Sequence, residues 1–216
     1  MVFLNCHPTG DLTKVMFTRG LVSYAKLSDY LRLYDFSWVL EVSKVDDGRR
    51  MLLADVGRGN SHATRSIARS GLPLQRSARP GLHRDQLTET YAVAYVYYIR
   101  YCLHDYSNEA AIAILGVIAD PMAGDNRLLI AEQVLDDPPS APTASLDLLM
   151  LTVSGKERTE EMWRDVIAAA GLELADVFSA EGNPPAVLEC VKPGGGTNGH
   201  LGVRRSVSMW CSISCI

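Results

Sequence analysis

The chain has 216 residues, a formal net charge of -4 and a hydrophobic content of 47 %, which fit a soluble globular protein with one well-buried domain and an appendage. The weakly acidic balance argues against nucleic acid as a partner, because proteins that bind a phosphate backbone usually carry a basic excess. A neutral or weakly charged small molecule is the partner that this charge favours.

The cysteines and the N-terminus indicate a cytoplasmic protein. The five cysteines form an odd set without a Cys-x-x-Cys pair, so neither a disulfide framework nor a metal site is expected. The N-terminal residues contain no basic stretch leading into an apolar segment. The longest apolar runs, such as residues 92–99, are far too short to cross a membrane, so no membrane association is expected.

The first half of the chain predicts helices followed by one strand–turn–helix unit. Between residues 12 and 34, apolar side chains recur at intervals of three and four, which predicts one or two amphipathic helices that end at residues 34–38. Residues 51–57 form a short apolar run that predicts a strand. The segment 62–71 that follows has the pattern of a helix closed by Gly71.

The middle of the chain predicts two buried strands, each leading to a polar side chain. Residues 92–103 are rich in β-branched and aromatic side chains and lead directly to His104 and Asp105. A predicted helix over 108–122 leads to a strand over 127–135 that ends near Glu132. Ligands of open α/β sheets bind at the carboxyl ends of such strands.

The last third predicts two helices and an antiparallel strand pair. A proline-broken loop at 136–142 precedes a helix over 143–153 and the loop 154–158. Thr159 then caps a second helix that ends at Gly171, and residues 172–180 and 185–192 form a hairpin-like pair at the sheet edge. The alternation of strands and helices predicts an α/β fold, a mostly parallel sheet in a three-layer sandwich.

Four sequence segments, in order and at a characteristic spacing, resemble the C-terminal domain of plant and fungal small-molecule O-methyltransferases. They are LLADVGRGNSHA at 52–63, LHDYSNE at 103–109, NRLLIAEQVL at 126–135 and SGKERTEEMW at 154–163. The resemblance implies a Rossmann-like class I methyltransferase fold, S-adenosylmethionine as cofactor and no metal. It further implies that the acceptor is the hydroxyl of a phenolic or polyketide-like small molecule of secondary metabolism.

The resemblance also divides the chain into three parts. Residues 1–48 correspond to a remnant of the helical region that dimerises and covers the substrate in the family. A homodimer of this chain is therefore neither predicted nor excluded. Residues 49–192 correspond to the catalytic domain. Residues 193–216 begin with three glycines within four residues and show no periodicity, so they are assigned to an irregular tail.

Asp55, Gly57 and Gly59 form the turn that the resemblance assigns to the cofactor, and Asp85 matches the acid near the adenine. Small residues after a strand let backbone amides approach a ligand, although the same pattern also serves ordinary strand–helix packing.

Two departures from the family pattern concern the cofactor region. Arg58 and Ser61 replace glycines of the family turn, and the 21 residues from Gly71 to Tyr91 are fewer than the roughly 30 that a full strand–helix–strand unit needs. A shortened sheet is therefore expected.

The resemblance assigns the catalytic set to His104, Glu132 and Glu157, with the imidazole as base and the two acids as its orienting partners. Taken singly, each has another interpretation: a buried or capping histidine, a salt-bridge partner and a helix N-terminal charge. Proton transfer from a phenol with a pKa near 10 to an imidazole near 6.5 is uphill by about 5 kcal/mol, and a neighbouring carboxylate reduces this penalty. Asp105 is interpreted as a helix cap.

Two further hypotheses compete with the methyltransferase. One is a degenerate methyltransferase fold that has lost cofactor binding and persists as a partner or scaffold or as an inactive product, as Arg58, Ser61 and the shortened segment suggest. The other is a nicotinamide-dependent oxidoreductase, which is disfavoured because His62 stands where a third small residue is wanted and no acid follows about twenty residues later.

Overall fold

The computed structural model describes residue 30 and residues 32–45, 50–56, 94–151, 154–180 and 185–194. In chain order the elements are α3 (Ser37–Val45), β1 (Met51–Val56), β2 (Ala94–Arg100), the 3₁₀ turn η2 (Leu103–Asp105), α6 (Asn108–Ala119), β3 (Arg127–Leu135), α7 (Ala141–Met150), β4 (Arg158–Thr159), α8 (Glu160–Ala169), β5 (Glu173–Ser179) and β6 (Pro185–Val191). None of the helices in these segments is long and apolar enough to cross a membrane.

The strands form one mixed sheet in the order β1-β2-β3-β6-β5, with β4 paired to β3 beside this path. The pairs β1–β2, β2–β3 and β3–β4 are parallel, whereas β6 runs antiparallel to both β3 and β5. The carboxyl ends of β1, β2 and β3 therefore lie at one edge of the sheet, where ligands of α/β proteins bind.

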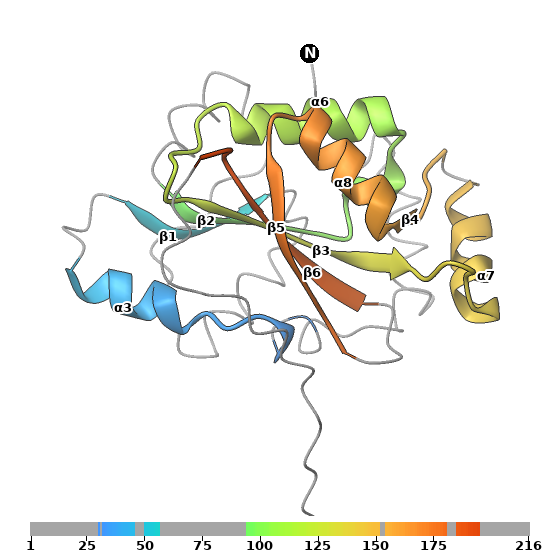
Figure 1. The fold of residues 1–216 in the computed structure, drawn as a ribbon, viewed down its shortest axis with the longest axis horizontal. Helices are drawn as coiled ribbons and strands as arrows, with labels where there is room; N and C mark the ends of the chain where they lie inside the picture. The colour runs from blue at the N-terminus through green and yellow to red at the C-terminus, as the bar shows by residue number, and fades with distance from the viewer. Residues whose placement is uncertain are drawn as a thin grey trace, which may run out of the picture.

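Helices cover both faces of this sheet, which gives three layers (Figure 1). On one face, α6 and α8 pack on a buried core that includes Leu115, Trp163 and Leu188. On the other face, α3 and Tyr30 belong to a second core with Val96 and Leu129. The strands β2, β3 and β6 are buried on both sides, which explains their almost continuous apolar sequences.

The helix α8 shows how local sequence sets an element. Thr159 accepts a hydrogen bond from the Met162 amide, and Glu160 and Glu161 lie in the first turn, where negative charge is favoured. The helix buries Trp163, Val166 and Ile167, which lie on one face at helical spacing, and Gly171 follows its end with φ of 78°.

Near the site, β3 has two successive parallel neighbours along one of its edges. The last residue pair between β2 and β3 is Arg100 with Ala131, and the first pair between β4 and β3 is Val134 with Arg158. Glu132 and Gln133 lie between these pairs. The chain that leaves β2 turns here and carries His104.

The described residues confirm most of the expected elements and correct some of them. The strands at 51–57, 92–103 and 127–135, the helix at 108–122 and the antiparallel last pair are present, with boundaries that differ by at most three residues. The helical pattern before residue 34 ends as expected, because residues 34–36 are not helical. A further helix that was not predicted, α3, then begins at Ser37, where the Ser37 amide donates to the Asp35 carboxylate at 2.9 Å. The helix expected over 143–153 begins at Ala141 and ends at Met150. The strand β4 was not predicted.

Several sequence predictions lie outside the described residues. They are the helices between residues 12 and 29, the helix at 62–71, the length of the segment 71–91 and the tail beyond residue 194.

Leu188 lies in β6, is fully buried and belongs to the core under α6 and α8. We expect Leu188→Ala to lower the free energy of unfolding by about 2–5 kcal/mol, because it removes apolar contacts and leaves a cavity. Urea unfolding measures this difference. The matched control is Leu148→Ala, at a side chain that is 66 % exposed, with a change within about 0.5 kcal/mol. Equal effects of the two variants would contradict this packing.

Candidate active site

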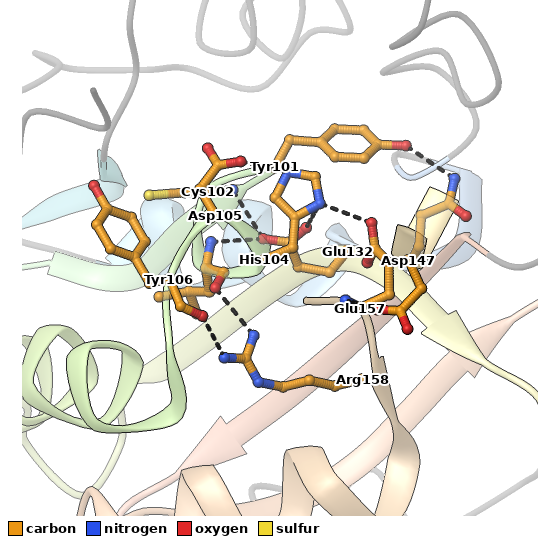
Figure 2. Close-up of polar contacts among 11 residues, drawn as sticks. Tyr101, Cys102, His104, Asp105, Tyr106, Glu132, Asp147, Glu157 and Arg158 are labelled. Atoms are coloured by element: carbon orange, nitrogen blue, oxygen red, sulfur yellow. Dashed lines mark hydrogen bonds and ion pairs between the residues drawn. The ribbon is translucent and has the colours of Figure 1, made fainter. Parts of the chain in front are cut away.

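His104 is presented by a tight turn directly after β2. Tyr101 adopts a φ of 45°, a left-handed backbone that is uncommon for a bulky residue, and this reverses the chain out of the strand. Leu103 to Asp105 then form the single 3₁₀ turn η2. The ring of Tyr101 lies 5.4 Å from the imidazole of His104, centroid to centroid, at a tilt of 48° (Figure 2).

Glu132 supports this turn from the neighbouring strand. Its Oε1 accepts hydrogen bonds from the amides of Cys102 at 2.8 Å and Leu103 at 2.9 Å (Figure 2). The side chain is fully buried, and its Oε2 lies 3.8 Å from His104 Nδ1. A buried carboxylate with two amide donors and a nearby cationic partner is electrostatically compensated.

Glu157 reaches the same nitrogen from the segment before β4. Its Oε1 lies 2.9 Å from His104 Nδ1, and its own amide donates to Asp147 Oδ1 of α7 at 2.9 Å. Gly155 permits this approach, because a Cβ there would lie 2.2 Å from the carbonyl oxygen of His104. The pairing of Arg158 with Val134 then fixes Glu157 beside Glu132.

The two acids control the protonation of His104. Burial disfavours the charged imidazole, but Glu132, the hydrogen bond to Glu157 and the charges of Glu157 and Asp105 outweigh it and raise the pKa of His104 to about 9. Burial raises the pKa of Glu132, whereas His104 lowers it.

The geometry assigns different roles to the two ring nitrogens of His104. Because Nδ1 faces both Glu132 and Glu157, it is the nitrogen that keeps its proton and donates it. Nε2 is then the basic nitrogen of the neutral ring. It lies 3.6 Å from Oδ1 of Asp105. The arrangement can therefore accept a proton at Nε2 while Nδ1 stays anchored.

Comparison with known proteins assigns a family to this arrangement. Residues 81–173 match the family model described as O-methyltransferase domain. A methyltransferase named fsa4 from Fusarium sp. (strain FN080326) is 32 % identical over 180 residues, which cover 73 % of this chain and 50 % of that protein. The chain therefore contains an O-methyltransferase domain.

Solved structures share the Rossmann-like class I fold of this O-methyltransferase domain. The mitomycin 7-O-methyltransferase MmcR superposes with a TM-score of 0.64 at 24 % identity, covering 85 % of this chain and 58 % of that one. LepI, solved in complex with SAM, gives a TM-score of 0.64 at 19 % identity, covering 84 % of this chain and 52 % of that one. The chain spans about half the length of these relatives.

The structure describes only part of the expected cofactor turn of this O-methyltransferase domain. The backbone of Asp55 lies in β1 opposite Tyr98 of β2, so the chain leaves β1 at the edge of the sheet where His104 follows β2. Gly57, Gly59 and Asp85 lie outside the described residues.

Three residues of the site were not assigned a role from the sequence, or were assigned another one. Asp105 does not cap α6, because Ser107 does so by accepting from the Ala110 amide, and Asp105 faces His104 instead. The sequence pattern placed Tyr101 inside a continuous strand. Arg158 lies in the segment 154–163 that resembles the family, but no role was predicted for it. The polar residues flanking His104 and Glu157 were the available signal.

Two further observations concern the methionines and metal binding. Met122 belongs to the main hydrophobic core, and Met150 is buried at the end of α7. No group of three or more His, Cys, Asp and Glu side chains arranged to hold a metal ion occurs among the residues that the structure describes.

We expect His104 to titrate with a midpoint near pH 9 in nuclear magnetic resonance spectra, far above the ordinary value of 6.5. The stability that this group contributes is complete below about pH 6.5 and is lost as the pH rises through about 9. Glu157→Gln removes one of the charges that favour the imidazolium and should lower the midpoint. Glu160→Gln, at an exposed acid paired with Arg164, is the control. A wild-type midpoint near 6.5 would refute this electrostatic account.

Proposed function

We propose that this chain carries the catalytic part of an S-adenosylmethionine-dependent O-methyltransferase that acts on a hydroxyl of a phenolic or polyketide-like small molecule. The observation that supports the reaction type is the buried group of His104, Glu132 and Glu157 at the carboxyl edge of the parallel strands. The names of the relatives in the same family agree with methyl transfer, and the O-methyltransferase MmcR agrees with an oxygen acceptor.

The cofactor would be held at the end of β1, where Asp55 leads into the turn with Gly57 and Gly59. This placement fits, because β1 and β2 are parallel neighbours and both chains leave the sheet on the same side. S-adenosylmethionine supplies an activated methyl group on a sulfonium centre, and its transfer to the acceptor oxygen leaves a neutral thioether. Asp85 is proposed as a contact for the adenine.

The protein's own part in the reaction is the removal of one proton. As the bond from the acceptor oxygen to the methyl group forms, its O–H bond breaks and His104 Nε2 receives the proton. The positive charge that the imidazole gains is stabilised by Glu157 at 2.9 Å and Glu132 at 3.8 Å. Glu132 and Glu157 are thus positioning residues that act through His104.

The raised pKa of His104 changes the energetics of this proton transfer. With a phenol pKa near 10 and an imidazole pKa of about 9, complete transfer is uphill by only ~1.4 kcal/mol. At neutral pH most of the imidazole is already protonated, so the active neutral form is scarce. Catalysis should therefore improve as the pH rises.

The principal test is methyl transfer by the purified chain with labelled S-adenosylmethionine and a panel of phenols. We expect kcat/KM to rise about tenfold per pH unit below pH 9 and then level off, because this quantity reports the free enzyme. His104→Gln should lower kcat by a factor on the order of 10²–10⁴ and leave cofactor binding within a fewfold, because the amide can still donate to Glu157. Retained turnover in this variant would remove His104 from the role of base.

The competing function is a methyltransferase fold that has lost its cofactor and acts through binding a partner. Arg58 and Ser61, which stand where the family turn has glycine, are the observation that favours it. Calorimetric titration with S-adenosylmethionine separates the two functions. One-to-one binding excludes the degenerate protein, whereas no heat of binding together with a native fold excludes the enzyme.

A further inference from the structure

Arg158 is a fully buried cation that the chemistry above does not use. Its guanidinium donates from Nη1 to the carbonyl oxygen of Leu103 at 3.0 Å and from Nη2 to that of Tyr106 at 2.8 Å (Figure 2). Its Nε donates to Asn108 Oδ1 at the first residue of α6 at 3.0 Å. The guanidinium carbon also lies 5.0 Å from the ring centre of Trp163 in α8.

These contacts bracket the turn that holds the base. Leu103 precedes His104, and Tyr106 follows Asp105, so the guanidinium acts as a rigid fork of donors that holds the backbone on both sides of His104 and Asp105. Guanidinium is suited to this arrangement because its donors are fixed in one plane. The hydrogen bond to Asn108 ties the same fork to the start of α6.

The neighbouring residues of Arg158 hold the remaining groups of His104. The Lys156 amide donates to the carbonyl oxygen of His104 at 2.8 Å, and Glu157 holds its Nδ1 at 2.9 Å. Three consecutive residues, 156 to 158, therefore fix the carbonyl, the ring and the flanking peptides of the base. These contacts together set the orientation of the imidazole ring. If the hydrogen bonds of Arg158 are lost, Lys156 and Glu157 still contact His104, but the backbone around it is held less firmly.

We propose that Arg158 is a positioning residue that fixes the backbone on both sides of His104 and so aims Nε2 at the acceptor hydroxyl. The inference rests on the proposed function for its catalytic consequence. Its structural consequence, the control of the His104 turn, does not depend on methyl transfer.

Arg158 is also coupled by charge to the two acids that face His104. The groups that face the imidazole are Glu132 from β3, Glu157 from the segment before β4, Asp105 from its own turn and the ring of Tyr101. Burial lowers the pKa of Arg158, whereas Glu132 and Glu157 raise it, and a guanidinium remains charged throughout the working pH range. Removal of this cation leaves the acids less neutralised, so the pKa of His104 should rise further.

The test compares Arg158→Met, which removes the fork and the charge, with Arg158→Lys, which keeps the charge alone. We expect Arg158→Met to lower kcat per folded molecule by roughly 10- to 100-fold, with KM for the acceptor changed less, and to move the His104 midpoint to higher pH. Arg158→Lys should keep the wild-type midpoint and recover only part of kcat, because one ammonium does not reproduce the paired donors.

The matched control is Arg164→Met, at an exposed arginine of α8 that pairs with Glu160, and it should leave kcat and the midpoint unchanged. Lower thermal stability of Arg158→Met with wild-type kcat per folded molecule and an unchanged midpoint would show a merely structural role and overturn the inference. Should this variant not fold, Arg158→Lys decides, because wild-type turnover in it overturns the need for the fork.

The magnetic resonance titration separates this inference from the proposed function. If wild type transfers no methyl group, the methyltransferase proposal fails, while the His104 midpoint in Arg158→Met still tests the control of the turn. An unchanged midpoint in a folded Arg158→Met protein counts against Arg158 whatever the activity.

Discussion

The hydrogen bonds from the amides of Cys102 and Leu103 to Glu132 are the interaction on which the site depends. After β2 the Tyr101 amide still donates to the carbonyl oxygen of Ala131, but β4 begins to pair with β3 only at Val134, so the next two amides, of Cys102 and Leu103, have no strand carbonyl to bind. Buried amides need acceptors, and one carboxylate oxygen accepts from both. The turn that carries His104 forms beside β3 because an acid there replaces the missing strand carbonyls.

The same carboxylate couples the stability of the fold to the chemistry of the base. Its other oxygen lies near His104 Nδ1, and a fully buried negative charge favours a cation next to it. Glu157 adds a second acid and Arg158 a permanent cation, so the cluster is compensated by charge and not by solvent. The carboxylate that supports the turn also makes the imidazole a stronger base, so the structural and the electrostatic requirement fall on one side chain.

Sequence patterns predicted the strands and the two groups that follow them, but not the contacts between them. His104 and Glu132 were placed at one sheet edge because each comes at the end of an apolar run, and parallel strands share that edge. Glu157 was assigned through the resemblance alone, since β4 has two residues and no period to detect. The burial of Arg158 depends on carbonyl acceptors from a distant segment, which no local pattern encodes. The start of α3 had a local sequence signal, because the Asp35 carboxylate accepts from the Ser37 amide. The end of the helical pattern at residues 34–38 obscured this signal, so the helix was not predicted.

The contacts that shape the base and those that would bind the cofactor belong to different parts of the chain. The ion pairs and hydrogen bonds described for the His104 ring and its turn come from residues 101 to 158, whereas the expected cofactor turn follows β1. A change at Arg58 or Ser61 can therefore weaken cofactor affinity without disturbing the imidazole. The converse also holds, because Glu132 and Arg158 act on the turn after β2. The proposed proton-transfer group therefore does not by itself distinguish an active enzyme from a binding protein, and affinity for S-adenosylmethionine is the property that separates them.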